Sequence, residues 1–202
     1  MRRCLQMISK KLLDSPELKS EIKKFLKEHK EIWDIAIYGS VIRGKTIIRD
    51  IDFAIIFYSK TKLDNKLSLA QKLKQTLSKI IPYEIDIKGI DFYDFFDNAF
   101  IARKAILAEG YLLSRKKYQA ELFGFEAKYI FSYSLANLNH SKKIMFQYAL
   151  KGRRGQKGLL EMKGCEQIGR GTISVPVWNS EEFREFLEKQ NIKYKILKAL
   201  IY

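Results

Sequence analysis

Two aspartates separated by one residue, Asp50 and Asp52, stand at the start of the apolar segment Ile51–Phe57. This segment is short and rich in Ile and Phe, which predicts a buried β-strand. Side chains at positions i and i+2 of a strand share a face, so the two carboxylates point the same way. Adjacent carboxylates repel each other unless a cation lies between them. Oxygen ligands on a rigid strand suit a hard ion, and we therefore expect Asp50 and Asp52 to bind Mg²⁺ or Mn²⁺.

A turn that suits phosphate binding precedes these aspartates. A first apolar run, Ile35–Tyr38, ends in Gly39 and Ser40, and nine residues separate Ser40 from Asp50. A strand that turns sharply into a short helix leaves free backbone N–H groups, which bind phosphate. Gly39 allows the backbone to approach a ligand closely, and the Ser40 hydroxyl adds a hydrogen bond. The two strands therefore bring phosphate donors next to a pair of metal-binding carboxylates.

These residues resemble a known signature. Gly39-Ser40, the nine-residue gap and the run Asp50-Ile51-Asp52-Phe53 are similar to the motif of the DNA polymerase β nucleotidyltransferase superfamily. The added Arg43-Gly44 makes the chain most similar to the minimal nucleotidyltransferases of archaea and bacteria. The resemblance covers roughly residues 30–114, and it extends to Glu109-Gly110 before a short apolar run. Arg49 departs from the small polar residue that the family often has before the first Asp.

The resemblance implies a third carboxylate on a later strand. Asp86 meets this expectation, because it lies between two isoleucines in the alternating segment Tyr83–Lys88. It follows Asp52 by 34 residues, which leaves room for a crossover helix. We expect Asp86 either to ligate a second ion or to take a proton from the acceptor.

The activity implied by the resemblance is metal-dependent transfer of a nucleoside monophosphate from a nucleoside triphosphate to a hydroxyl acceptor, with release of pyrophosphate. Gly39 and Ser40 would hold the triphosphate. Arg43 and Lys45 would neutralise charge on pyrophosphate, although a solvated loop would have the same composition. Two alternatives stay open. One is AMP transfer to a small helical partner protein, as in toxin–antitoxin pairs, and the other is a non-catalytic nucleic-acid-binding protein on the same fold.

The chain is strongly basic, with a formal net charge of +15. Residues 1–110 carry a net charge of +6 and residues 111–202 carry +9. Such a charge favours a polyanionic partner such as RNA, while a lysine-rich solvated surface gives the same composition. No apolar run approaches the length of about 18 residues that spans a membrane, and no signal-type stretch follows Arg2 and Arg3. We therefore expect a soluble, cytoplasmic protein.

The predicted elements give an α/β (α+β) organisation with a mixed β-sheet flanked by helices. We expect residues 1–114 to form the nucleotidyltransferase domain and residues 115–202 to form a basic, mainly helical C-terminal region. A small α/β tail is expected at 159–202. Asp91, Asp94 and Asp97 are interpreted as acids that favour the start of a helix rather than as metal ligands.

The stretch 151–158 reads as a linker, because four of its eight residues are basic and three are Gly. Such a segment does not form a stable helix and exposes its charges. One interpretation is that it contacts the phosphates of RNA or another polyanionic acceptor, and the other is that it is only a solvated linker. The candidate polyanion-binding residues are Lys151, Arg153, Arg154 and Lys157.

Overall fold

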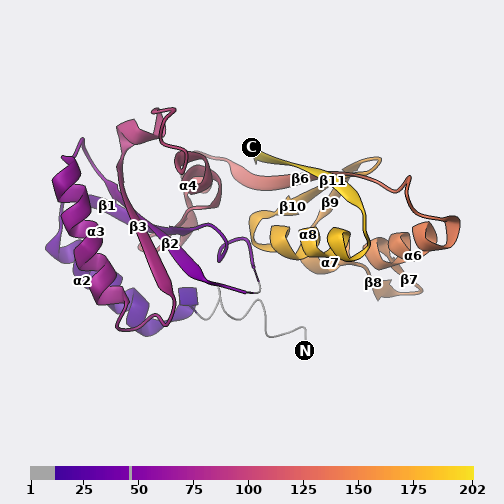
Figure 1. The fold of residues 1–202 in the computed structure, drawn as a ribbon, viewed down its shortest axis with the longest axis horizontal. Coiled ribbons are helices and arrows are strands. Elements are labelled where there is room, and N and C mark those ends of the chain that lie inside the picture. The colour runs from indigo at the N-terminus through magenta and orange to yellow at the C-terminus, as the bar shows by residue number, and fades with distance from the viewer. Residues whose placement is uncertain (1–11, 46) are drawn as a thin grey trace. The chain divides into compact units, whose positions relative to one another are not determined.

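The computed structural model describes residues 12–45 and 47–202, and the chain divides into two compact units. The first unit is Met1–Phe125 and the second unit is Glu126–Tyr202. Each unit has its own main sheet (Figure 1). None of the helices in the described ranges combines the length and the apolar character that crossing a lipid bilayer requires.

The first unit is built on a five-stranded mixed sheet with the order β3-β2-β1-β4-β5. β2 and β3 are parallel, and the other neighbouring strands are antiparallel. This arrangement confirms the mixed sheet expected from the sequence. The strands are β1 (Ile32–Tyr38), β2 (Asp50–Phe57), β3 (Glu84–Asp91), β4 (Tyr111–Leu112) and β5 (Lys117–Tyr118).

Helices cover both faces of this sheet (Figure 1). α2 (Pro16–Glu28) and α3 (Leu63–Leu77) lie on one face, and α4 (Arg103–Glu109) lies on the other. On the α4 face, Ile106 packs with Ala36 and Ala54 in a buried cluster. The sheet is therefore buried from both sides along most of its length, which explains why β1 and β2 are almost continuously apolar. A short helix, α5 (Gln119–Leu122), completes the first unit.

Asp91, the last residue of β3, and Asp94 form a capping box at the start of a short helix, which agrees with their interpretation as acids that favour a helix start. The Asp91 carboxylate accepts a hydrogen bond from Tyr93 N at the start of the 3-10 helix η1 (Phe92–Phe95). Lys66 Nζ pairs with Asp91 Oδ2 at 2.9 Å and with Asp94 Oδ2 at 2.6 Å. These carboxylates therefore tie β3 to α3, and their charges are used within the fold.

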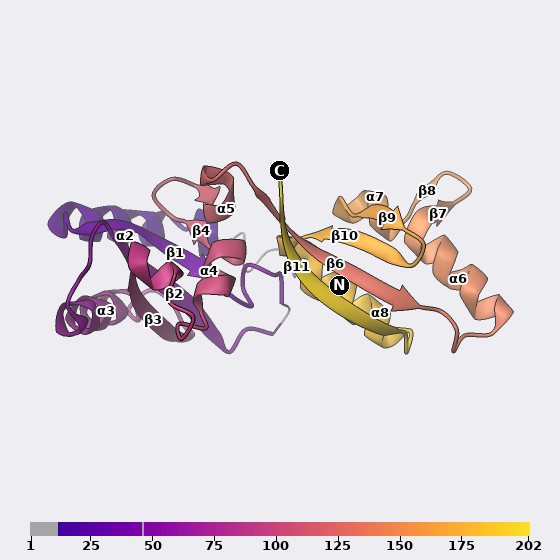
Figure 2. The same ribbon diagram turned by 90° about the horizontal axis from the view of Figure 1, so that it is seen from above.

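The second unit has a four-stranded antiparallel sheet with the order β11-β6-β10-β9 (Figure 2). Its main elements follow one another as strand, helix, strand, strand, helix, strand, with a hairpin and a short helix inserted after the first helix. This order and this strand arrangement are those of a ferredoxin-like fold. The elements are β6 (Glu126–Ser134), α6 (His140–Lys151), β7 (Gly152–Arg153), β8 (Gln156–Lys157), α7 (Leu159–Lys163), β9 (Glu166–Gly169), β10 (Thr172–Pro176), η2 (Val177–Asn179), α8 (Ser180–Lys189) and β11 (Lys193–Ile201).

The expectation that residues 115–202 are mainly helical is wrong for β6, which is a strand. Aromatic residues recur at every second position of this strand, at Tyr129, Phe131 and Tyr133, and such alternation places them on one face. The ring of Phe131 meets Phe183 of α8 at 4.9 Å between centroids, and that of Tyr133 meets Phe146 of α6 at 5.4 Å. Both helices thus cover the same face. Residues 159–202 share this sheet with β6 and do not form a separate tail.

The stretch 151–158 is not a linker. It forms the β7–β8 hairpin, in which Gly152 pairs with Lys157 and Arg153 pairs with Gln156. Arg154 and Gly155 form the two-residue turn, with φ angles of 51° and 79°. Positive φ at both central positions is the property of the turns that suit the twist of a β-hairpin.

Candidate active site

The register of three strands brings the predicted site residues together. Tyr38 of β1 lies opposite Asp52 of β2, and Asp52 lies opposite Asp86 of β3. Residues directly opposite each other in a sheet share a face. Asp50 has the same parity as Asp52, so all three aspartates point to the face that α4 covers further along the strands. The carboxylates lie at the end of the sheet where β1 finishes and β2 and β3 begin.

The Gly39 backbone is in close contact with the Asp52 carboxylate. Gly39 has a φ of +81°, and a Cβ atom at this position would lie 2.2 Å from Asp52 Oδ2. A real Cβ does not approach a carboxylate oxygen so closely. The Gly-Ser turn and the aspartate strand, which the sequence links only by spacing, therefore meet at this contact.

Asp52 lies among other charges. Burial raises its pKa above the ordinary value, and the negative charges of Asp50 and Asp86 raise it further. Lys88 and Arg43 act in the opposite direction. Lys88, two residues after Asp86 on the same face of β3, donates a hydrogen bond from Nζ to Asp86 Oδ2 at 2.8 Å. The site thus has three carboxylates and a lysine that pairs with one of them.

Tyr38 adds a buried hydroxyl to this group. Its Oη is buried and has no hydrogen-bond partner within the described ranges. Burial raises the pKa of the phenol, and the charges of Asp52, Asp86 and Glu109 raise it further. The hydroxyl therefore stays protonated at neutral pH and can donate a hydrogen bond to an oxygen brought into the site.

The turn after β1 is held by Arg43. Residues 39–44 form consecutive turns, closed by hydrogen bonds from Arg43 N to Gly39 O at 3.2 Å and from Lys45 N to Ser40 O at 3.0 Å. Arg43 Nη1 lies 2.6 Å from Glu109 Oε2, and this glutamate side chain is fully buried at the end of α4. The structure gives Arg43 a carboxylate partner that fixes the turn against α4.

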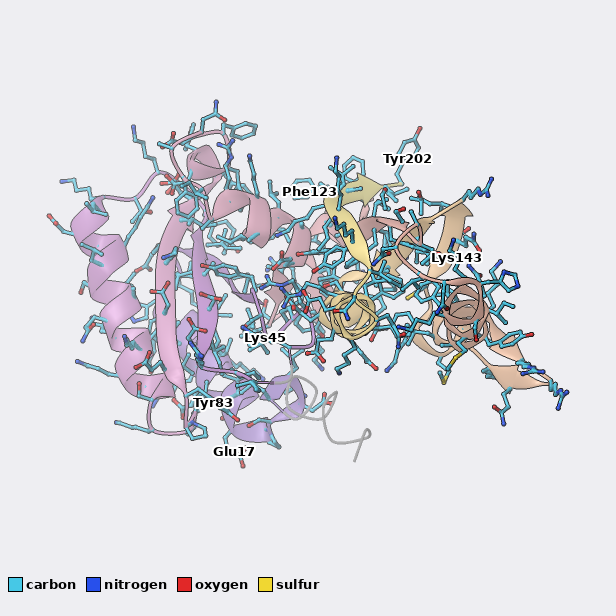
Figure 3. All side chains as sticks on the ribbon, turned by 45° about the vertical axis from the view of Figure 1, so that its right-hand side comes forward. Glu17, Lys45, Tyr83, Phe123, Lys143 and Tyr202 are labelled. Atoms are coloured by element: carbon cyan, nitrogen blue, oxygen red, sulfur yellow. The ribbon has the colours of Figure 1, made fainter. Side chains whose placement is uncertain are left out.

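Two other cations predicted near the site are exposed. Lys45, labelled in Figure 3, and Arg49 both lie in the segment between β1 and β2. Neither forms a salt bridge with any residue in the described part of the chain. Arg49 therefore does not neutralise the aspartates here.

The oxygen-only donor set fits a divalent cation in its chemistry. The repulsion that raises the pKa of Asp52 would be relieved by a cation between it and its neighbours. Among residues 12–45 and 47–202, however, no three His, Cys, Asp or Glu side chains converge closely enough to hold a metal ion. Lys88 Nζ lies 2.8 Å from one carboxylate oxygen of Asp86. The carboxylates of Asp50 and Asp52 have the chemistry that a divalent cation prefers, and the third carboxylate, Asp86, is paired with Lys88 in this structure.

Sequence reasoning did not identify Tyr38, Lys88 and Glu109 as members of the site. Strand parity was the available signal for Lys88, since it lies two residues from Asp86 in an alternating strand. Glu109 was noticed only as part of a Glu-Gly pair. Its contact with Arg43 joins positions 66 residues apart, and no local pattern reveals it.

A mixed sheet that brings a Gly-Ser turn and three aspartates to one end places phosphate donors next to oxygen ligands for a cation, which is what phosphoryl and nucleotidyl transfer require. Residues 20–119 match the sequence family described as polymerase beta, nucleotidyltransferase. The first unit therefore carries a nucleotidyltransferase domain of the polymerase β family. No curated protein matches the chain.

Three solved structures that match the chain come from toxin–antitoxin pairs. One is the MntA–HepT pair, with 16% identity over 52% of this chain and 81% of that chain, and a TM-score of 0.33. Another is the tri-AMPylated Shewanella oneidensis HEPN toxin in complex with the MNT antitoxin, with 18% identity, the same coverage and a TM-score of 0.33. A mutant of the first pair has 15% identity over 52% of this chain and 84% of that chain, and a TM-score of 0.36.

Proposed function

We propose that the first unit transfers a nucleoside monophosphate from a nucleoside triphosphate to a hydroxyl acceptor and releases pyrophosphate. The observation that carries this proposal is the contact of Gly39 with Asp52, because it brings a phosphate-binding turn and a crowded carboxylate group to one place. Neither feature alone distinguishes a transferase from an ordinary turn or a solvated strand end. The family match to residues 20–119 supports the same reaction class.

In this proposal, Asp50 and Asp52 bind Mg²⁺ or Mn²⁺, and Asp86 completes the site. A divalent ion bound there would neutralise phosphate charge and lower the pKa of the acceptor hydroxyl. Gly39 and Ser40 hold the triphosphate through backbone N–H groups and the serine hydroxyl.

The transfer itself exchanges one P–O bond for another. Asp86 accepts the proton of the acceptor hydroxyl, and the acceptor oxygen forms a bond to the α-phosphorus. The bond between that phosphorus and the oxygen bridging to the β-phosphate breaks, and pyrophosphate leaves with the electron pair. Lys45 is exposed beside the turn and is assigned to neutralise charge on the leaving group. Arg43 acts mainly by holding the turn through Glu109.

The test is a labelling reaction. The full chain is incubated with each α-labelled nucleoside triphosphate and Mg²⁺ or Mn²⁺, in the presence of RNA, candidate partner proteins or small alcohols. We expect label to pass to one acceptor class in a divalent-dependent reaction, together with release of pyrophosphate. The acceptor that becomes labelled identifies the substrate, including whether it is a protein.

Two aspartate variants make this test specific. Asp52→Asn should abolish transfer, because it removes the central carboxylate. Asp64→Asn is the matched control, since Asp64 is exposed in the first turn of α3 and belongs to no ion pair in the described structure. The proposal is wrong if Asp52→Asn retains the activity of the wild type, or if no acceptor is labelled with either ion.

A further inference from the structure

The second unit contains a groove that the proposed transfer does not use. It has a volume of about 800 Å³ and lies along α6. His140, Lys143, Gln147 and Lys151 line it from α6, with the spacing of three and four residues that places side chains on one helix face. The other side is formed by the end of β6 and by Arg170 in the turn between β9 and β10. All of these residues lie within the second unit.

The groove is cationic. Lys143, Lys151 and Arg170 are its charged residues apart from the titratable His140, and no Asp or Glu lines it. None of the three forms a salt bridge with residues that the structure describes. The second unit contains 14 Lys and Arg against 7 Glu, and α6 has no acidic residue. Unpaired cations on a surface without carboxylates produce a positive potential that attracts phosphate.

Aromatic and amide groups lie between these cations. Tyr133 and Tyr148 are among the residues that line the groove, together with Gln147 and Gln167. The guanidinium of Arg153 lies 4.4 Å from the centroid of the Tyr148 ring, so the β7–β8 hairpin adds a cation at this side. Rings next to cations bind bases and phosphates together, as in sites for single-stranded nucleic acids.

The exposed sheet face of this unit does not offer such rings. In ferredoxin-like domains that bind RNA, aromatic residues on the open sheet face stack on bases. Here the aromatic residues of β6 face the helices, and the open face carries Lys128, Ile130 and Ser132. The β6 rings therefore lie on the helix side of the sheet, which is the side of the groove.

We propose that this groove binds a single-stranded oligonucleotide, with Lys143, Lys151 and Arg170 contacting its phosphates. Lys143 and Lys151 are eight residues apart on α6, which separates them by about 12 Å along the helix axis, and Arg170 lies on the other side of the groove. A single phosphate group would contact one of them, whereas a chain of phosphates contacts all three. The binding site is separate from the aspartate site and stands whether or not the first unit transfers nucleotides.

The four candidate polyanion-binding residues of the 151–158 segment differ in their position relative to the groove. Lys151 lines the groove and Arg153 packs on one of its rings. Lys157 instead pairs with Glu161 at 2.5 Å, and Arg154 lies in the hairpin turn. Lys151 and Arg153 are thus assigned to nucleic-acid binding, while Arg154 and Lys157 contribute only to the surrounding potential.

Fluorescence anisotropy of the full chain with a labelled 12-nucleotide single strand tests the proposal. The groove variant is Lys143→Gln, Lys151→Gln and Arg170→Gln. Its affinity should fall by about 10- to 100-fold at moderate salt, and the slope of log affinity against log salt should decrease by about 2, because about 0.7 is lost per phosphate contact. The matched control is Lys142→Gln, Lys193→Gln and Lys195→Gln, which removes the same charge from exposed positions outside the groove. This control should retain the wild-type affinity to within about threefold.

Three probes of one sequence distinguish the ligands: single-stranded RNA, single-stranded DNA and the DNA duplex. Tighter binding of single-stranded RNA would assign the groove to RNA. Equal affinity for single-stranded RNA and single-stranded DNA would assign it to single-stranded nucleic acids in general. Binding the duplex as tightly as the strands would overturn the proposal. Equal losses in the two triple variants would also overturn it, because they would show a response to net charge alone.

A charge-conserving variant shows whether a loss of binding comes from lost charge or from misfolding. Lys143→Arg, Lys151→Arg and Arg170→Lys should keep both the affinity and the salt slope. Photocross-linking of a thiouridine-containing strand to the wild-type chain gives an independent measurement. We expect cross-linked peptides from α6 and from the β9–β10 turn, and cross-links confined to other segments would contradict the proposal.

Discussion

At the scale of single residues, Gly39 is the position of the candidate site that tolerates substitution least. Two constraints apply there, a φ of +81° and the Asp52 oxygen 2.2 Å from where a Cβ would stand. Gly124 shares the first constraint, with a φ of +77°, but nothing lies within 4 Å of its Cβ position. The two glycines therefore separate the backbone effect from the steric effect.

We expect Gly39→Ala to destabilise the first unit by about 1–3 kcal/mol, because both the backbone and the carboxylate are strained. Gly124→Ala should cost only the backbone part, about 1–2 kcal/mol. Urea denaturation of both variants measures the difference. If the two variants have the same midpoint, the Asp52 carboxylate moves away at no cost and the contact is not restrictive.

Asp52 should make stability depend on pH. Its pKa is raised in the folded chain, so the folded state holds the proton more tightly than the unfolded state. Stability from this group is present at low pH and is lost as pH rises through the folded pKa. In the presence of a chelator, Asp52→Asn should therefore melt at a higher temperature than the wild type at pH 7. The difference should shrink towards pH 4, and thermal melting at several pH values checks this. A lower melting temperature at pH 7 would mean that Asp52 is not electrostatically crowded.

At the scale of elements, strand register determines the geometry of the site. The i, i+2 spacing within β2 was readable from the sequence, and so was the turn at Gly39. The sequence does not show that β2 and β3 are parallel or that Asp52 lies opposite Asp86, because both depend on pairing between distant segments. β6 was not predicted, because Tyr129 and Tyr133 are also four residues apart, which a helix allows. Only the packing of Phe131 on α8 and of Tyr133 on α6 shows that the period is that of a strand.

The ion pair between Arg43 and Glu109 connects the turn to α4, and it should be strongly coupled. Arg43→Gln leaves a fully buried carboxylate without this partner, which costs about 3–5 kcal/mol. Glu109→Gln should cost less, because the remaining arginine is partly exposed and can reach water. The double variant should be more stable than the sum of the single changes predicts. A double-mutant cycle by denaturant unfolding measures the coupling, and additive effects would show that the pair does not stabilise the turn.

At the scale of the whole molecule, each unit has its own core. Phe53 is fully buried in the first unit, and Phe131 is fully buried in the second. Two sheets with no strand in common give each unit a separate set of backbone hydrogen bonds. Local stability can therefore differ between them.

We expect Phe131→Ala to destabilise the second unit by about 3–5 kcal/mol. Hydrogen exchange should become faster at amides of β6 and β10 and stay unchanged at amides of β1, β2 and β3. Phe53→Ala should produce the reverse pattern. Equal acceleration in both units for either variant would show that the chain unfolds as one cooperative body.

The face of the sheet on which the β6 rings lie depends on the register of a single strand. A shift of one position along this strand would move Tyr129, Phe131 and Tyr133 to the open sheet face, where they would form a stacking platform without any change of topology. Two ferredoxin-like domains can thus have the same element order while the aromatic residues of the first strand occupy odd-numbered positions in one and even-numbered positions in the other. This difference determines which face of the sheet has rings that can stack on bases. Placing rings at Ile130 and Ser132, the second of which is exposed, would add such a platform to this chain by two substitutions.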